Sequence, residues 1–121
     1  MRGVGAYEID IPLFVDLRGC LVAFQQNSPL PFKPVRVFVI VDVPPDAHRA
    51  QHEVSCDEFL WMAAGACHAL VRASASRDDG HTFHLVKCGR GLYLPKGAWI
   101  DLFGFALDSV LVCMAEAEYE M

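Results

Sequence analysis

The stretch that decides the fold is His52-Glu53-Val54-Ser55-Cys56-Asp57-Glu58, followed after six further residues by Gly65. A second stretch begins at Gly89 and ends in Pro95-Lys96-Gly97. Residues two apart in a β-strand point to the same face, so positions 52 and 54 share a face, and Glu58 can join them from the next strand. The glycines and the proline are typical of turns. These two stretches predict paired short strands around one pocket.

The rest of the sequence has the rhythm of an all-β protein. Short β-branched and aromatic runs recur about every ten residues, separated by Gly, Pro, Asp and Ser. Asp78-Asp79-Gly80 predicts a hairpin, and Pro44-Pro45-Asp46 predicts a turn. Nine strands are expected, at Tyr7–Ile11, Gly19–Gln25, Val35–Val43, Glu58–Ala63, Cys67–Ser74, Thr82–Val86, Gly91–Leu94, Trp99–Gly104 and Ser109–Ala115.

Length and composition predict a single domain over residues 1–121 with a dense core. The chain is 54% hydrophobic and 21% charged, and its length leaves no room for a second core. The run Val35–Val43 is apolar at nearly every position, so we expect both of its faces to be covered, one by the interior and one by a partner or a second sheet. The apolar excess favours a homodimer.

Charge and cysteine content exclude several classes of partner. The net charge is −5, and the ten Lys and Arg residues are scattered, so we expect no nucleic-acid polymer as a partner. The five cysteines are odd in number and form no CxxC pair, which favours a reduced, cytoplasmic setting. No apolar run approaches the ~20 residues that span a bilayer. An acidic chain can still bind an anionic small molecule through one or two arginines.

The two opening stretches resemble the two motifs of the cupin superfamily, HxH(x)3E(x)6G and G(x)5PxG(x)2H. The resemblance implies a cupin fold, that is, a double-stranded β-helix or jelly-roll barrel. Val54 and Ile100 stand at positions where metal-binding cupins carry histidine. Only His52 and Glu58 remain of the four usual ligands, so we expect no bound metal, and a metal-dependent cupin dioxygenase or isomerase is the weaker alternative.

A longer pattern resembles the dTDP-4-keto-6-deoxyhexose 3,4-ketoisomerases, the FdtA-like or WxcM-like proteins. The resemblance runs from Asp16 to Tyr119. Its pieces are Asp16-Leu17-Arg18-Gly19-Cys20-Leu21, Leu30-Pro31-Phe32, Arg36-Val37-Phe38, Arg49-Ala50-Gln51-His52, Asp78-Asp79-Gly80, Gly91-Leu92-Tyr93-Leu94-Pro95, Trp99 and Asp108-Ser109-Val110-Leu111-Val112. The resemblance implies a cofactor-independent isomerase that moves a keto group between C4 and C3 of a dTDP-linked sugar.

The resemblance assigns proton transfer to His52, which matches the first histidine of the family's R-G-x-H-A-H motif. The chain departs from that motif at Ala50 and Val54, and Phe38 and Val39 replace the tyrosines that follow the early arginine. A core role for His52 is the alternative. Because proton-handling groups are missing, the second functional hypothesis is a non-catalytic nucleotide-sugar-binding or assembly protein.

Other candidate residues follow from burial and charge. Glu58 precedes an apolar run, so an inward carboxylate there would have a raised pKa suited to acid–base catalysis. Arg36 lies in an apolar strand and needs an anionic partner, either the ligand diphosphate or an internal carboxylate such as Glu58 or Asp42. Arg49 is expected either to pair with the ligand diphosphate or an internal carboxylate in the same way, or to be solvated at the surface. Three aromatic residues are also expected to contact the substrate: Phe38, Tyr93 and Trp99. The alternative is that they belong to the hydrophobic core.

Overall fold

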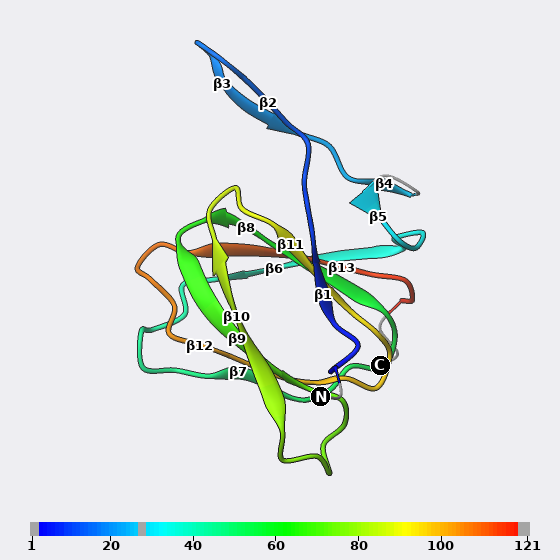
Figure 1. The fold of residues 1–121 in the computed structure, drawn as a ribbon. Helices are drawn as coiled ribbons and strands as arrows, with labels where there is room; N and C mark the ends of the chain where they lie inside the picture. The colour runs from blue at the N-terminus through cyan, green and yellow to red at the C-terminus, as the bar shows by residue number, and fades with distance from the viewer. Residues whose placement is uncertain (1–2, 27–28, 119–121) are drawn as a thin grey trace.

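The computed structural model describes residues 3–26 and 29–118, so Tyr119, where the family resemblance ends, lies outside the described residues. The all-β prediction is confirmed, because the described residues form strands and turns and no helix. Two antiparallel sheets face each other (Figure 1). One has five strands in the order β1 (Tyr7–Ile9), β11 (Gly91–Leu94), β8 (Glu58–Ala64), β13 (Val110–Ala115) and β6 (Arg36–Val41). The other has four, in the order β10 (Gly80–Val86), β9 (Ala66–Arg72), β12 (Trp99–Phe103) and β7 (Arg49–Glu53).

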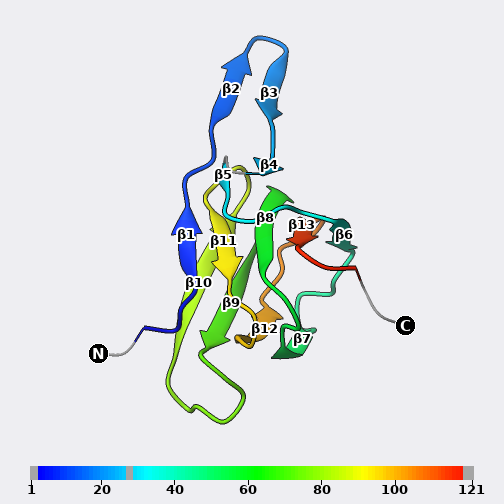
Figure 2. The same cartoon turned by 90° about the vertical axis from the view of Figure 1, so that its right-hand side faces the viewer.

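Two small sheets complete the chain. The antiparallel hairpin of β2 (Leu13–Asp16) and β3 (Gly19–Val22) projects from the body of the molecule (Figure 2). Strands β4 (Gln25–Gln26) and β5 (Pro29–Leu30) pair in parallel near its base. Among the described residues there is no helix that is long and apolar enough to cross a membrane.

The core lies between the two large sheets. In β9, Cys67, Ala69 and Val71 alternate with partly exposed neighbours and are themselves fully buried. They pack in one cluster with residues of the facing sheet such as Leu60 and Leu111. Each large apolar side chain buried in this way contributes about 1.5–3 kcal/mol to folding. The two-residue period of the strands therefore fixes which side chains face the space between the sheets.

The glycine of the first motif ends β8 for a steric reason. Gly65 has a φ of +76°, which L side chains rarely adopt. A Cβ atom at this position would also collide with Ser109. The Ser109 hydroxyl donates to the carbonyl oxygen of Ala106 and accepts from the amide N–H of Ala66, so it ties this turn to the loop before β13.

The predicted hairpin at Asp78-Asp79-Gly80 is confirmed, since β9 and β10 pair antiparallel from Gly80 opposite Arg72. Strand β11 has the predicted bounds. Strands β2, β5 and β7 are absent from the predicted set. The outer face of β6 is not covered within this chain: Val37, Val39 and Val41 are each about half exposed.

Candidate active site

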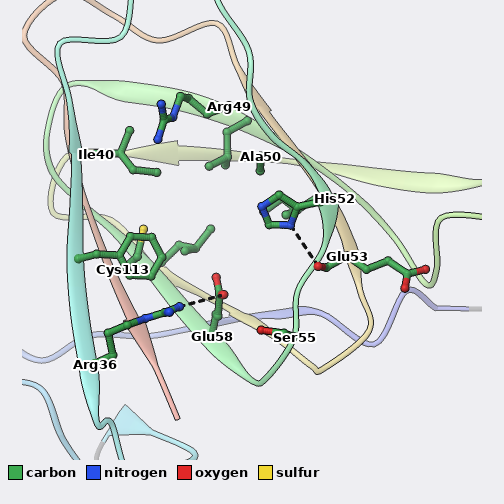
Figure 3. A pocket seen from close by; sticks show the side chains of 13 residues that line it. Arg36, Ile40, Arg49, Ala50, His52, Glu53, Ser55, Glu58 and Cys113 are labelled. Carbon is green, nitrogen blue, oxygen red and sulfur yellow. Dashed lines mark hydrogen bonds and ion pairs between the residues drawn. The ribbon is translucent and has the colours of Figure 1, made fainter. Parts of the chain in front are cut away.

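A cavity of about 560 Å³ opens between the sheets (Figure 3). Strands from both sheets contribute to it, namely β6, β7, β8, β12 and β13. Its lining combines two arginines, a histidine and two carboxylate residues with an apolar wall: Arg36, Phe38, Ile40, Arg49, Ala50, His52, Glu53, Ser55, Glu58, Leu60, Ile100, Leu102 and Cys113. A volume of this size fits a small organic ligand.

Strand β6 contributes three side chains by simple alternation. Arg36, Phe38 and Ile40 point inward, while the valines between them point outward. The Arg36 Nη2 atom lies 3.9 Å from Glu58 Oε2, and its guanidinium also lies over the Phe38 ring at 4.9 Å from the ring centroid. Of the two expected partners of Arg36, the internal carboxylate is therefore present, and the residue faces the cavity as well.

Strand β7 brings Arg49 and His52 to the same face through a β-bulge. An odd separation of three places two residues of a regular strand on opposite faces. Here Arg49 lies opposite Leu102 and His52 opposite Ile100, with one register shift between them. The extra residue is accommodated by left-handed φ angles of 73° at Ala50 and 60° at Gln51. Arg49 thus lines the cavity on the same side as His52, although its side chain remains exposed to solvent.

The His52 ring is oriented by the backbone. Its Nδ1 atom lies 3.1 Å from the carbonyl oxygen of Glu53, and because a carbonyl only accepts, Nδ1 carries the proton in this contact. The neutral ring then has its lone pair on Nε2, which points toward the cavity in Figure 3. The residue is exposed and lines the cavity, so it is not a core histidine.

Glu58 is the buried carboxyl of the cavity, with an exposed fraction of 9%. Burial raises the pKa of Glu58 above its ordinary value, although the electrostatic interactions with Arg36 and then His52 act in the opposite direction. This agrees with the expectation for an inward carboxyl group. A raised pKa allows Glu58 to hold a proton closer to neutral pH, as a general acid must.

Several lining residues were not singled out from the sequence, among them Ser55 and Cys113. Ser55 lies between His52 and Glu58 in the first motif, and Cys113 lies opposite Phe38 in β13. Position within the motif could have indicated Ser55, and alternation along β13 could have indicated Cys113. Burial strongly raises the pKa of the Cys113 thiol. Cys113 is therefore a wall residue and not a nucleophile.

The structure does not bring Tyr93 and Trp99 to this cavity. The Tyr93 hydroxyl donates to Asp57 Oδ2 at 2.9 Å, and its ring packs 4.9 Å from that of Tyr7. Trp99 lies under the guanidinium of Arg72, which is 4.7 Å from its ring centroid. Both are on the side of their strands that faces away from the cavity, because the neighbours Leu94 and Ile100 point inward.

The two positions where metal-binding cupins carry a second and third histidine hold apolar side chains that are packed in the core. Val54 and Ile100 are 3% exposed and belong to the main hydrophobic cluster. In the described part of the chain, no three His, Cys, Asp or Glu side chains gather to form a metal-binding group. The donor set of this cavity does not fit a divalent ion.

Comparison with known proteins places the chain among nucleotide-sugar isomerases. Residues 5–121 match the family described as FdtA: WxcM-like, C-terminal. A TDP-4-oxo-6-deoxy-alpha-D-glucose-3,4-oxoisomerase of Aneurinibacillus thermoaerophilus is 27% identical over 116 residues, which cover 93% of this chain and 79% of that protein.

Solved structures give the same picture of the fold. The TDP-quinovose 3,4-ketoisomerase of Campylobacter jejuni has a TM-score of 0.87 at 25% identity, covering 96% of this chain and 88% of that one. A mutant 3,4-ketoisomerase of Thermoanaerobacterium thermosaccharolyticum, solved with TDP-4-keto-6-deoxyglucose, has a TM-score of 0.86 at 22% identity and covers 95% and 82%. The cupin fold predicted from the two motifs is confirmed.

Proposed function

The chain belongs to the FdtA family of WxcM-like proteins, and from this membership we propose that it is a 3,4-ketoisomerase of deoxysugar biosynthesis. The proposed substrate is a dTDP-linked 4-keto-6-deoxyhexose. The named relatives act on TDP-sugars, and one of them is solved with such a sugar bound. The observation that carries the proposal is the His52 ring, with Nδ1 held by a carbonyl and Nε2 facing the cavity.

His52 is suited to the first proton transfer. Its Nε2 lone pair takes the C3 proton, the C3–H electron pair forms a C3–C4 double bond, and the C4 carbonyl oxygen receives the negative charge. Protonation of O4, return of a proton to C4 and loss of the O3 proton then give the 3-keto sugar, so the sugar gains no net proton. C4 is reduced by the same two electrons that C3 loses, so the reaction requires no external oxidant or cofactor.

Glu58 and the arginines have complementary roles in this proposal. Glu58, with its raised pKa, donates a proton to the developing enediolate and so replaces a histidine that is absent at Val54. Arg36 and Arg49 lie on two different strands lining the cavity and bind anionic oxygens of the diphosphate or the enediolate. Phe38 offers its ring face to the sugar.

The experiment is incubation with dTDP-4-keto-6-deoxyglucose in D₂O. We expect deuterium at C3 of recovered substrate and at C4 of a 3-keto product. NMR and mass spectrometry measure this deuterium incorporation. His52→Gln is the matched variant, because it removes the base and keeps side-chain polarity. Binding of dTDP with no exchange at either carbon would overturn the isomerase and leave a nucleotide-sugar-binding protein.

We also propose that the protein works as a cytoplasmic homodimer. Support for the dimer comes from two apolar surfaces exposed in the single chain. One is the valine face, formed by Val37, Val39 and Val41 on β6, and the other is the β2–β3 hairpin with Phe14 and Val15 exposed. A second copy would cover both surfaces at once. The absence of disulfides among the five cysteines fits a reducing compartment.

A further inference from the structure

The outer face of the four-stranded sheet carries a histidine–carboxylate pair directly behind the cavity. The His48 Nδ1 atom lies 2.9 and 3.0 Å from the two carboxylate oxygens of Asp101. Asp101 is only 7% exposed, and the His48 ring stacks on Phe103 with centroids 5.5 Å apart and planes 17° apart. An ionised carboxylate accepts only, so Nδ1 donates to it. The pair covers a buried charge that would be costly to leave unpaired.

This pair joins the two strands at the β-bulge. Asp101 lies opposite Ala50 in the register, and its neighbours Ile100 and Leu102 point into the cavity on the other face. His48 immediately precedes Arg49, so fixing the His48 ring on the outer face directs the Arg49 side chain to the inner face. The His48–Asp101 pair, called the clamp below, therefore acts where the chain enters the bulge.

The bulge itself needs such a constraint. Ala50 and Gln51 are consecutive non-glycine residues with left-handed φ angles, a conformation that the surrounding contacts must enforce. Without the bulge, Arg49 and His52 could not share the cavity face. The geometry of the site thus depends on a locally unfavourable backbone held from behind.

We propose that His48 is a positioning residue, which through Asp101 holds the bulge that directs Arg49 and His52 together into the cavity. Its role in catalysis rests on the proposed isomerase function. Its role in backbone geometry does not, because the His48–Asp101 contact and the register shift are independent of any substrate.

The test compares three variants of the full chain. His48→Ala removes the donor. His48→Asn restores it, because an asparagine amide N–H can take the place of the Nδ1–H. His84→Ala is the matched control, since His84 is at the far end of the same ring stack: it stacks on His68 at 4.5 Å, and His68 in turn stacks on Phe103, so this variant perturbs the stack and leaves the His48–Asp101 contact in place. Each variant is measured by steady-state kinetics with dTDP-4-keto-6-deoxyglucose and by amide hydrogen exchange.

With His48→Ala, we expect kcat/KM to fall by about 10²-fold, with kcat lowered through His52 and KM raised through Arg49. Amide hydrogen exchange should become faster at residues 50–52 and stay unchanged in β10. His48→Asn and His84→Ala should resemble the parent protein in both measurements. Parent-like exchange in His48→Ala, or equal damage in His48→Asn, would overturn the proposal. If the parent protein itself has no isomerase activity, the proposed function fails and the exchange data alone decide the clamp.

Discussion

The guanidinium of Arg36 lies 3.9 Å from the Glu58 carboxylate, and yet the pKa of Glu58 is raised. The loss of solvation on burial outweighs the attraction of Arg36 and His52. The carboxyl group is therefore more easily protonated in the folded protein than in the unfolded chain. This imbalance makes the stability of the protein depend on pH.

For Glu58→Gln we expect a pH-dependent difference in Tm. Because the folded pKa lies above the unfolded one, the stabilisation from Glu58 is complete below the unfolded value and is lost as pH rises through the folded value. The Tm of the parent minus that of Glu58→Gln should therefore fall as pH rises above about 4, the range in which an ordinary glutamate titrates. Thermal unfolding across this range measures it, with the exposed Glu118→Gln as the control for the loss of one charge. A difference that grows with pH would contradict the burial argument.

Replacing His52 should abolish most of the turnover without loss of the fold. Removal of a general base costs about 10²–10⁴-fold in rate, so kcat of His52→Gln should fall by that factor. Circular dichroism and the affinity for dTDP should change little. His81→Gln is the control, because His81 is also exposed but lies outside this cavity. Equal loss in both variants would show that the effect is not specific to His52.

Ala50→Gly should stabilise the protein. Glycine adopts the observed φ of 73° without the steric cost that alanine pays, and the gain should be about 1 kcal/mol after the greater freedom of the unfolded chain is deducted. Urea denaturation gives the free energy of unfolding. Ala69→Gly, in the regular and fully buried part of β9, should instead destabilise. A lower midpoint for Ala50→Gly would contradict the strain at the bulge.

Placing a charge on the valine face should dissociate the proposed dimer. Val39 is the middle residue of that face, and Val39→Asp would bury a carboxylate in an apolar interface. We expect the parent to sediment as a dimer and Val39→Asp as a folded monomer in analytical ultracentrifugation. Val86→Asp changes a comparably exposed valine on β10 and should leave the dimer intact. A monomeric parent protein would reject the homodimer.

The sequence predicted the parts of the fold in which pattern and packing agree. Strand β11 and the β9–β10 hairpin follow from alternation and turn residues, and the structure has them as expected. Strand β7 was missed because Arg49–Glu53 is polar and contains a bulge, so it has neither an apolar run nor a regular period. Strand β2 was missed because its three apolar residues are followed at once by the turn of an exposed hairpin.

The site was predictable to the extent that it follows from motifs and single-strand alternation. His52, Glu58, Arg36 and Phe38 were expected to contact the ligand, and the structure places them around one cavity. The side chain of Arg49 points into the cavity because of the bulge, and no residue pattern in the sequence predicts that bulge. Tyr93 was expected in the site, but its direction depends on the pairing of β11 with β8, which puts it opposite Phe59 on the side away from the cavity.

The position of β6 at the sheet edge has a consequence for biosynthesis. Its one partner in the large sheet is β13, the last strand of the described chain, so β6 leaves the ribosome long before it can pair. At ordinary translation rates the interval from Val41 to Ala115 lasts roughly 4–15 s. During that time an apolar strand has both edges open, which is the condition under which nascent chains aggregate. Yield in a cell should therefore depend on chaperones that bind extended apolar segments.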